Sequence, residues 1–332
     1  MSAPQSAPSE PVLSVRDLTV EFRTRRGSLT ALDGISLQIS KGEVLGVVGE
    51  SGAGKSVTGA AVIGLLAGGG RITGGEIRLS GLRIDNLPER QMRPIRGKRI
   101  GMVFQDPSVS LDPLLTIGDQ LTETIRVHLN VDAAGARRRA VELLEETGIA
   151  NAEQRLSSYP HEFSGGMRQR VVIALALAGE PELVIADEPT TALDVSVQAQ
   201  ILELLRKLCR ERRTALLLIT HDMGVIARMA DRVAVMYAGR VVEVGPVDEV
   251  VRRPRHPYAR GLMAAIPPLT HRPERLVQIP GSMPRLSAIP VGCAFHPRCE
   301  ASFGPCERSR PSLRRDGPVD VACHLFDADA AR

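Results

Sequence analysis

The stretch GESGAGKS at residues 49–56 has the spacing of a phosphate-binding loop: a glycine, four residues, then Gly-Lys-Ser. It follows the apolar run VLGVV at 44–48 and precedes a helix predicted to begin around Lys55. Its glycines let the backbone turn N–H groups toward phosphate, Lys55 reaches the β- and γ-phosphates, and the Ser56 hydroxyl ligates Mg²⁺. The pattern predicts a nucleotide site that includes Gly49, Ser51, Gly52, Gly54, Lys55, Ser56 and Val57.

Two carboxylates follow a second apolar run. LVIADEP at 183–189 predicts a buried strand that delivers Asp187 and Glu188 at its C-terminal end, the edge where ligands bind in such sheets. We expect Asp187 to hold Mg²⁺ and Glu188 to act as the general base toward the attacking water. Capping of a following helix is the alternative, and it is disfavoured because both carboxylates come directly after a wholly apolar strand.

Further polar residues stand where they could meet phosphate. Gln105 follows RIGMVF and His221 follows LLLIT, so each ends an apolar strand and could contact the γ-phosphate side of the site. Taken alone, either one is more typical of an ordinary loop residue or a satisfied histidine, and the other motifs are what favour a phosphate contact. The stretch FSGGMRQR at 163–170 is a glycine-paired turn that opens a predicted helix, an arrangement that binds anions. One chain with one nucleotide loop therefore carries a second anion-binding turn.

Alternating and continuous apolar runs indicate the sheet that must position these residues. LSVRDLTVEF and ALDGISLQI alternate, which predicts half-exposed antiparallel strands, whereas VLGVV, LVIADE and TALLLIT are typical of doubly covered parallel strands. Residues from about 113 to 160 change to helical spacing. We predict an α/β fold: a P-loop ATPase core with a mixed sheet (a parallel core plus an antiparallel β subdomain), an inserted helical subdomain and a loop-rich C-terminal extension.

Composition divides the chain into three segments. Residues 1–10 are rich in Ser, Ala and Pro, which predicts a disordered tail. Residues 11–250 form the predicted nucleotide-binding domain, with its helical subdomain at about 106–178. Residues 251–332 are dense in Pro, Arg and His and carry four of the five cysteines, which predicts the C-terminal extension.

Composition also restricts the function. The longest apolar runs fall far short of the roughly 18–20 residues of a membrane-spanning helix, and the N-terminus lacks a secretory pattern, so we expect a cytoplasmic protein. The net charge of +4 is carried by scattered arginines, and only 3% of the residues are aromatic. With no long basic tail and few stacking residues, nucleic-acid binding is not expected.

The order GESGAGKS, FQDP, FSGGMRQR, LVIADEP, TALD and THD resembles the ATP-binding subunit of ABC transporters over roughly residues 12–250. The resemblance implies an ATPase in which the Ser-Gly-Gly turn contacts the γ-phosphate of ATP held by a partner subunit, so that two chains enclose two nucleotides. This explains the second anion-binding turn. Phe163 and Met167 depart from the usual Leu and Gln, but neither supplies backbone donors to the turn.

The same resemblance implies roles for individual residues. Gln105 would ligate Mg²⁺, sense the nucleotide and couple to membrane subunits, and His221 would orient the γ-phosphate. Phe22 matches the aromatic residue that stacks on adenine, although a Phe that ends a strand is commonly a core residue. The residues implied at the dimer interface are Ser164, Gly165, Gly166 and Asp194.

Within the family, FQDPSVSLDP, RHPYARGLMAAIP and the Pro-rich, cysteine-bearing tail look like the dipeptide, oligopeptide and nickel importer branch. This implies a second, homologous ATP-binding subunit, two membrane permeases, an extracytoplasmic substrate-binding protein, and peripheral attachment to the cytoplasmic face of the membrane. Helices led by SLDPLLTIGDQL would receive a coupling helix from a permease. We expect import of di- or oligopeptides, with nickel or another small solute as the alternative.

Two other functional classes are disfavoured. A soluble ABC ATPase that acts on nucleic acid normally has two nucleotide domains or a long coiled-coil insertion, and this sequence has neither. A metal-sensing module that merely retains nucleotide binding would have a damaged site. The ATPase residues are intact at Lys55, Asp187, Glu188 and His221.

Four cysteines of the extension are separated by five, six and sixteen residues, a spacing equally compatible with a metal site and with unrelated thiols. A cytoplasmic location disfavours disulfides. Because the segment has little apolar periodicity, a metal would supply missing stability. The resemblance to peptide importers implies a 4Fe–4S cluster, with zinc as the alternative. These residues are Cys293, Cys299, Cys306 and Cys323, whereas Cys209 is expected to be a buried apolar residue.

Overall fold

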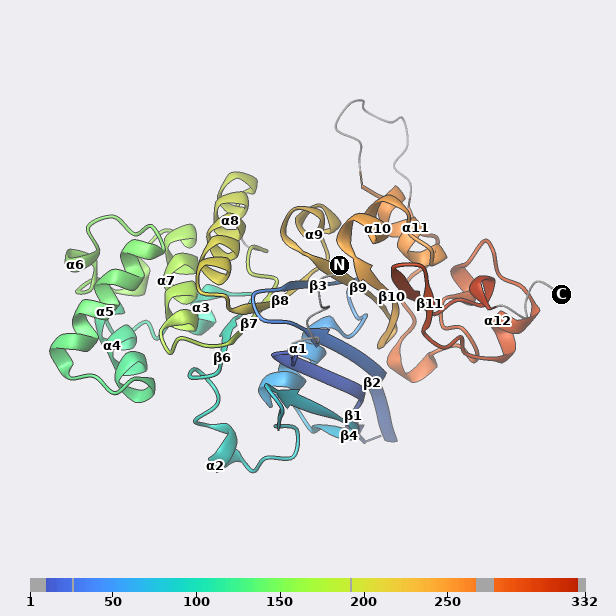
Figure 1. Ribbon diagram of the computed structural model, residues 1–332, viewed down its shortest axis with the longest axis horizontal. Helices are drawn as coiled ribbons and strands as arrows, with labels where there is room; N and C mark the ends of the chain where they lie inside the picture. The colour runs from blue at the N-terminus through green and yellow to red at the C-terminus, as the bar shows by residue number, and fades with distance from the viewer. Residues whose placement is uncertain (1–9, 26, 192, 267–277, 328–332) are drawn as a thin grey trace, which may run out of the picture. The chain divides into compact units, whose positions relative to one another are not determined.

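A computed structural model describes residues 10–25, 27–191, 193–266 and 278–327 (Figure 1). Of the predicted N-terminal tail, all but residue 10 lies outside the described residues. The chain divides into two compact units. Within the described residues, the first unit consists of 10–14, 38–44 and 78–218, and the second consists of 15–37, 45–77 and 219–327.

Parallel strands form the centre of the first unit. β6 (Ile100–Val103) pairs in parallel with β7 (Leu183–Asp187), and β8 (Ala215–Thr220) follows β7 in the same sheet. Strands that are paired in parallel require a crossover connection, and the last helix of this crossover is α7 (Gly165–Leu177). A Cβ at Gly101 of β6 would lie 2.1 Å from the carbonyl oxygen of Ala176, so glycine permits the close approach of α7.

The helical insertion follows local start signals. Thr116 and Asp119 form a capping box at the start of α4 (Ile117–His128), and the Asp132 side chain caps α5 (Ala133–Glu146) by accepting a hydrogen bond from Gly135 N–H. The predicted helical spacing over 113–160 is confirmed. The short helices of the first unit are α2 (Glu89–Met92), α3 (Pro107–Ser110), α4 (Ile117–His128), α5 (Ala133–Glu146), α6 (Ala152–Arg155) and η1 (Pro160–Glu162).

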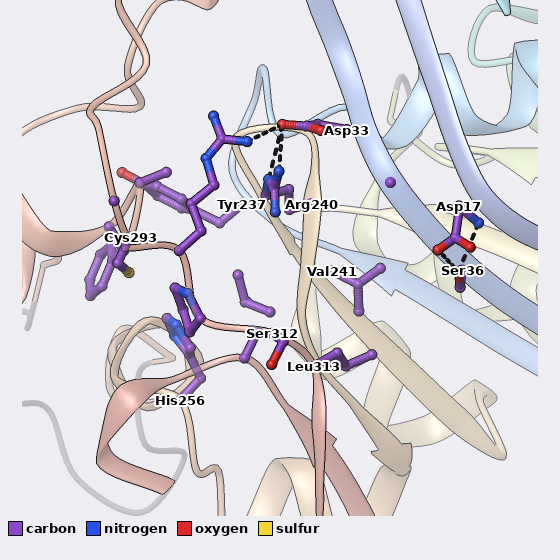
Figure 2. A pocket seen from close by; sticks show the side chains of 18 residues that line it. Asp17, Asp33, Ser36, Tyr237, Arg240, Val241, His256, Cys293, Ser312 and Leu313 are labelled. Atoms are coloured by element: carbon purple, nitrogen blue, oxygen red, sulfur yellow. Dashed lines mark hydrogen bonds and ion pairs between the residues drawn. The ribbon is translucent and has the colours of Figure 1, made fainter. Parts of the chain in front are cut away.

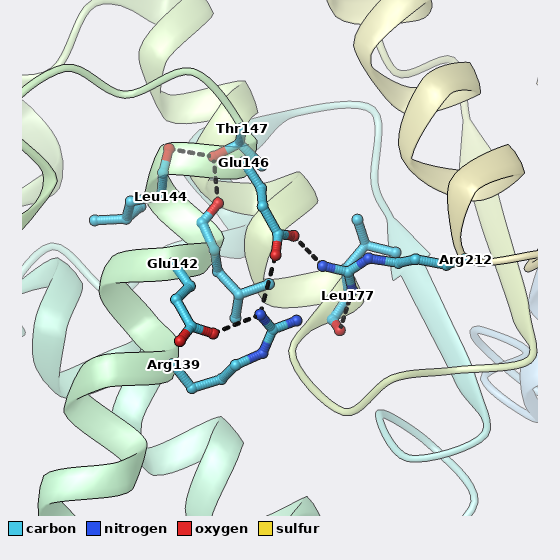
Figure 3. Close-up of polar contacts among 8 residues, drawn as sticks. Arg139, Glu142, Leu144, Glu146, Thr147, Leu177 and Arg212 are labelled. Atoms are coloured by element: carbon cyan, nitrogen blue, oxygen red, sulfur yellow. Dashed lines mark hydrogen bonds and ion pairs between the residues drawn. The ribbon is translucent and has the colours of Figure 1, made fainter.

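An ion-pair network connects helices of the first unit. The Glu146 carboxylate, at the end of α5, accepts hydrogen bonds from Arg139 and from Arg212, which directly follows α8 (Val195–Glu211) (Figure 3). Arg212 also donates to the carbonyl of Leu177, the last residue of α7. The insertion is thereby joined to both helices that flank β7.

The second unit contains most of the remaining strands, whereas β5 and the last two residues of β4 belong to the first unit. β3 (Val44–Val48) pairs in parallel with β9 (Arg232–Tyr237), which is antiparallel to β10 (Arg240–Pro246). The mixed sheet predicted from the sequence is therefore confirmed. In a second sheet β2, β1 and β4 are neighbours, and β4 pairs antiparallel with β5. The bounds of these strands are β1 (Leu13–Thr24), β2 (Gly27–Ile39), β4 (Gly70–Leu79) and β5 (Leu82–Arg83).

The C-terminal extension packs on the strands of the second unit. β12 (Val319–Val321) pairs antiparallel with β10, and β11 (Arg314–Asp316) pairs antiparallel with β12. Phe295 is buried and its ring lies 5.2 Å from that of Tyr237 on β9. The helices of this unit are α1 (Lys55–Ile63), α9 (Met223–Met229), α10 (Val247–Arg252), α11 (Pro257–Ala264), η2 (Leu286–Ala288), η3 (His296–Arg298), α12 (Gly304–Arg308) and η4 (His324–Phe326).

No helix within the described part of the chain combines the length and the hydropathy needed to cross a membrane.

Candidate functional site

The loop at 49–54 connects β3 to α1 and lies close against neighbouring backbone. A Cβ at Gly49 would approach the carbonyl oxygen of Met236 to 2.3 Å. Gly54 has a φ of +102°, and a Cβ there would approach the Leu32 side chain to 2.8 Å. Only glycine fits these two positions, so the packing of β2 and β9 constrains the two ends of the loop.

The loop has the donors that a phosphate chain requires. Lys55 is buried, and its Nζ donates to the carbonyl oxygens of Gly49 at 2.9 Å and Glu50 at 3.1 Å, which holds the ammonium group against the loop. Gly54 at the N-cap has no side chain with which to cap α1, the arrangement in which helix N-termini bind phosphate. Ser51 and Ser56 are exposed and Val57 is half-buried. The loop and the first residues of α1 therefore fit the phosphates of a nucleoside triphosphate.

Glu188 follows β7 directly and has a φ of +47°, which is uncommon for a residue with a side chain. Its carboxylate accepts a hydrogen bond from Gln105 Nε2 at 3.3 Å and one from Thr191 Oγ1 at 2.8 Å. The parallel register of β6 and β7 brings the Gln105 and Glu188 ends of the two strands to the same edge. Asp187 ends β7 and is half-buried.

The Ser-Gly-Gly turn begins α7. The Ser164 hydroxyl accepts a hydrogen bond from Met167 N–H at 3.3 Å, and it caps the helix in this way. A Cβ at Gly166 would lie 2.7 Å from Val197, so the start of α8 packs closely on this turn. Gly165 is half-buried, and Phe163, the departure from Leu, is buried.

Asp194 caps α8. Its carboxylate accepts hydrogen bonds from Val197 N–H at 3.0 Å and from the Ser196 hydroxyl at 2.7 Å, and these bonds lower the pKa of Asp194. Asp194 and Gly166 thus meet at Val197, which links the predicted dimer-bridging carboxylate to the Ser-Gly-Gly turn within one unit. The bridging role itself stays a prediction.

Two other predicted residues belong to the second unit. His221 is exposed and follows β8, and the neighbouring Asp222 caps α9 by accepting from Gly224 N–H at 2.7 Å. Phe22 on β1 is half-buried, and its ring lies so close to Gly70 that a Cβ there would approach it to 2.8 Å. Their roles toward nucleotide stay predictions, as do those of the magnesium ligands Ser56, Gln105 and Asp187.

The prediction of an iron–sulfur cluster at the four cysteines of the extension is wrong. Within the described residues, which include all four, no group of three or more His, Cys, Asp or Glu side chains could hold a metal ion. All are free cysteines. Burial raises the pKa of the Cys323 thiol to about 11 and raises that of Cys293 as well, which favours protonated thiols over the thiolates that metals require.

The reason for the error is physical. The lack of apolar periodicity in the extension predicts that a metal supplies its stability, but the extension instead packs on other segments of the second unit. β12 joins β10, and Phe295 packs on Tyr237 and on Tyr258, whose rings lie 5.2 and 5.3 Å away. Cys209, by contrast, is a buried residue of α8 as predicted, with its pKa raised to about 12 by burial.

The sequence interpretation missed several residues that contact either the phosphate loop of the second unit or Glu188 of the first unit. Glu50, inside the loop, forms an ion pair with Arg298, and its backbone N–H donates to Tyr258. Thr191 contacts the proposed base, Glu188. Arg298 and Tyr258 have no local pattern that would have indicated these contacts, whereas Thr191 stands three residues after Glu188, a spacing that suggests proximity.

A cavity of about 350 Å³ in the second unit is separate from the loop residues. Its lining includes Asp33, whose carboxylate accepts hydrogen bonds from Arg240 and Arg310, and the buried His256 (Figure 2). The two guanidinium groups lower the pKa of Asp33 against the effect of burial. None of the residues at 49–56 lines this cavity.

A model of the ABC transporter family matches residues 32–191, and a model of the oligopeptide/dipeptide transporter C-terminal region matches residues 242–306. The chain is 46% identical to the oligopeptide transport ATP-binding protein AppD of Bacillus subtilis, over 96% of this chain and 98% of that protein. It is 48% identical to the oligopeptide transport ATP-binding protein OppD of Escherichia coli, over 91% of this chain and 90% of that protein.

Solved structures agree with this family. A dimeric, post-hydrolysis structure of the ATP-binding cassette MJ0796 with ADP and Pi matches with a TM-score of 0.64 and 29% identity, covering 71% of this chain and 98% of that one. The cbiO1 subunit of an ABC transporter complex from Clostridium perfringens matches with a TM-score of 0.63 and 30% identity, covering 74% and 92%. The chain therefore belongs to the ATP-binding proteins of ABC transporters, in the oligopeptide/dipeptide branch, and is an ATPase.

Proposed function

We propose that this protein is the ATP-hydrolysing subunit of an ABC importer for di- and oligopeptides. The main support is how much of the chain is similar to peptide transport proteins. The similarity includes the C-terminal region at 242–306, and it extends over nearly the whole length of relatives named as oligopeptide transport proteins. Nickel or another small solute is the alternative, because it is the other cargo of the branch that the sequence resembles.

Hydrolysis follows from the residues at the ends of β6 and β7. Glu188 accepts the proton of the attacking water, and Gln105, within hydrogen-bond distance of it, orients the carboxylate. Lys55 binds the β- and γ-phosphates, and Ser164 of a second subunit completes the site. Mg²⁺, for which the predicted ligands are Ser56, Gln105 and Asp187, neutralises charge on the phosphates when it is bound.

The proposed partners are a second ATP-binding subunit, two membrane permeases and an extracytoplasmic binding protein, with this chain at the cytoplasmic face of the membrane. The support for permease docking is a group of exposed apolar residues in the insertion. Leu114 is 82% and Val109 is 81% exposed, in the segment between β6 and α4. Singly exposed apolar residues are common, but two such side chains five residues apart, one in α3 and one after it, fit a docking surface.

The test is reconstitution of the full complex in liposomes with the cognate binding protein. Peptides of two to five residues should stimulate ATP hydrolysis and accumulate inside the vesicles, and Glu188→Gln complexes should do neither. Stimulation by Ni²⁺ without any response to peptides would replace the peptide assignment by the nickel one. A complex that responds to neither solute would contradict both.

A further inference from the structure

Every polar group of Glu50 in the phosphate loop is engaged. Its carboxylate accepts two hydrogen bonds from Arg298, with Nη1 at 2.7 Å and Nη2 at 2.9 Å. Its backbone N–H donates to the Tyr258 hydroxyl at 2.8 Å, and its carbonyl accepts from Lys55 Nζ at 3.1 Å. Two of these three contacts come from residues more than 200 positions away, in the segment after residue 250.

Arg298 is itself fixed in place. Its side chain is only 6% exposed, its Nε donates to the Pro280 carbonyl at 2.7 Å, and its guanidinium lies 5.8 Å from the ring centre of Tyr237 and 5.9 Å from that of Phe295. A planar guanidinium held in a bidentate pair fixes both the distance and the orientation of the carboxylate. The hydrogen bonds to Glu50 raise the pKa of Arg298, so it stays charged.

Tyr258 is held from the other side. Its backbone N–H donates to His256 Nδ1 at 3.0 Å, and the backbone N–H of His256 donates to the Glu243 carboxylate at 2.7 Å. Glu243 lies on β10 and is fully buried. A chain of hydrogen bonds therefore runs from the interior of the sheet through Tyr258 to the loop.

We propose that Arg298 is a positioning residue of the ATP site: with Tyr258 it holds Glu50, and through Glu50 it keeps the phosphate loop in its nucleotide-binding shape. The C-terminal extension then contributes directly to the ATPase site, because it supplies both residues that hold Glu50. The inference depends on the ATPase activity and is independent of which solute is transported.

Removal of the Arg298 side chain is expected to lower the affinity for ATP. Without Arg298 the free loop occupies its binding shape for only a fraction of the time, and the apparent affinity falls by that fraction. Bound phosphates restore the shape, so turnover at saturating ATP should change little. A purely structural role predicts instead a lower melting temperature with unchanged affinity of the folded fraction.

The experiment measures the Kd of the full-length chain for mant-ATP, and KM and kcat in the assembled complex. Arg298→Ala should raise Kd and KM about tenfold, a coupling in the range of side chains in direct contact, with kcat within about twofold. Arg298→Lys keeps the positive charge but cannot form the planar bidentate pair with Glu50, so its Kd should lie between those of the wild type and Arg298→Ala. Arg310→Ala is the matched control, because Arg310 also pairs with a carboxylate in this unit but does not touch the loop.

A double-mutant cycle attributes the effect to the pair. Because each substitution removes the same interaction, Glu50→Gln with Arg298→Ala should weaken mant-ATP binding no more than Arg298→Ala alone. A folded Arg298→Ala protein with wild-type Kd, or strictly additive effects in the cycle, would overturn the proposal. If Arg298→Ala does not fold, Glu50→Gln takes its place, with a tenfold weaker Kd in support and a wild-type Kd against.

Discussion

Gln105 and Glu188, 83 residues apart in the chain, lie within hydrogen-bond distance, with Gln105 Nε2 3.3 Å from Glu188 Oε2. The contact follows from the parallel register of the two preceding strands, in which Val103 is paired with Ala186. Any change in the backbone that follows β6 will therefore move the group that faces the proposed catalytic base.

Glu188→Gln should retain ATP binding and lose hydrolysis by roughly a hundred- to ten-thousandfold, the usual contribution of a general base. The amide keeps the size of the side chain and can still meet Gln105, but it cannot accept a proton. Phosphate release and mant-ATP binding measure the two effects separately. Lys55→Ala is the contrasting variant, because it should lose binding itself. A Glu188→Gln protein with wild-type turnover would contradict the assignment of the base.

Ser164→Arg should leave ATP binding by the same chain within about twofold but reduce turnover of the assembled complex about a hundredfold, because the bulk and charge enter the partner's γ-phosphate site. Ser164→Thr keeps the hydroxyl that caps α7, so it separates the loss of the cap from the block of the site. Loss of ATP binding in the isolated Ser164→Arg chain would show that the turn serves its own nucleotide.

Leu114→Asp should weaken co-purification with the permeases by about tenfold or more, as expected for an apolar anchor in an interface. Val127→Asp is the control, because Val127 is 70% exposed near the end of α4, away from the segment that contains Leu114. Both variants should bind mant-ATP normally. Equal losses for the two variants would move the docking surface away from Leu114.

His256 gives the fold a defined pH dependence. Burial lowers its pKa from 6.5 to about 3, so between these values the unfolded chain binds a proton that the folded chain does not. Its contribution to stability is complete above pH 6.5 and falls by about 1.4 kcal/mol per pH unit as the pH decreases toward 3.

Asn in place of His256 can keep the acceptor for Tyr258 N–H but does not titrate. Urea unfolding at pH 7, 6 and 5 should show the wild-type free energy of unfolding falling more steeply than that of His256→Asn, by about 1.4 kcal/mol per pH unit below pH 6. Parallel profiles would show that His256 titrates normally in the fold.

Glu146→Ala should destabilise the protein by about 1–2 kcal/mol, because it leaves the guanidiniums of Arg139 and Arg212, each only 20% exposed, without their shared carboxylate. This loss is smaller than that expected for a fully buried ion pair, because the Glu146 side chain is 35% exposed and solvent weakens the interaction. Glu142→Ala removes a 57% exposed partner of Arg139 and should cost less than about 0.5 kcal/mol. Urea unfolding compares the two, and equal losses would contradict a special role for Glu146.

Features set by short-range patterns could be predicted from the sequence. The helix after the phosphate loop begins at Lys55, and the apolar run LVIAD forms β7 and ends at Asp187. Both follow from residues within one turn or one strand, where glycine conformation and apolar burial determine the structure. The sequence likewise predicts a helix start at the Ser-Gly-Gly turn, and α7 begins there, at Gly165.

Features that depend on contacts between residues far apart in the chain could not be predicted from the sequence. Arg298 stands 248 residues from Glu50, beside cysteines that suggested a metal, and no periodicity connects the two. The need for glycine at 166 depends on Val197, which only the packing of α7 on α8 brings close. The cysteines were misinterpreted for the same reason, since the packing that stabilises the extension is formed with residues of β9 and β10.

The pairing of β12 with β10 also determines which strand stands at one of the two edges of the eight-stranded sheet. Among the described residues that strand is β11, three residues long, where Arg314 and Arg315 are exposed. Short, charged border strands resist pairing with other molecules. β10, in contrast, carries the buried side chains of Val241, Val242 and Val244. We expect a chain cut before β11 to leave this apolar strand with unpaired backbone groups and to aggregate more readily than the full-length chain.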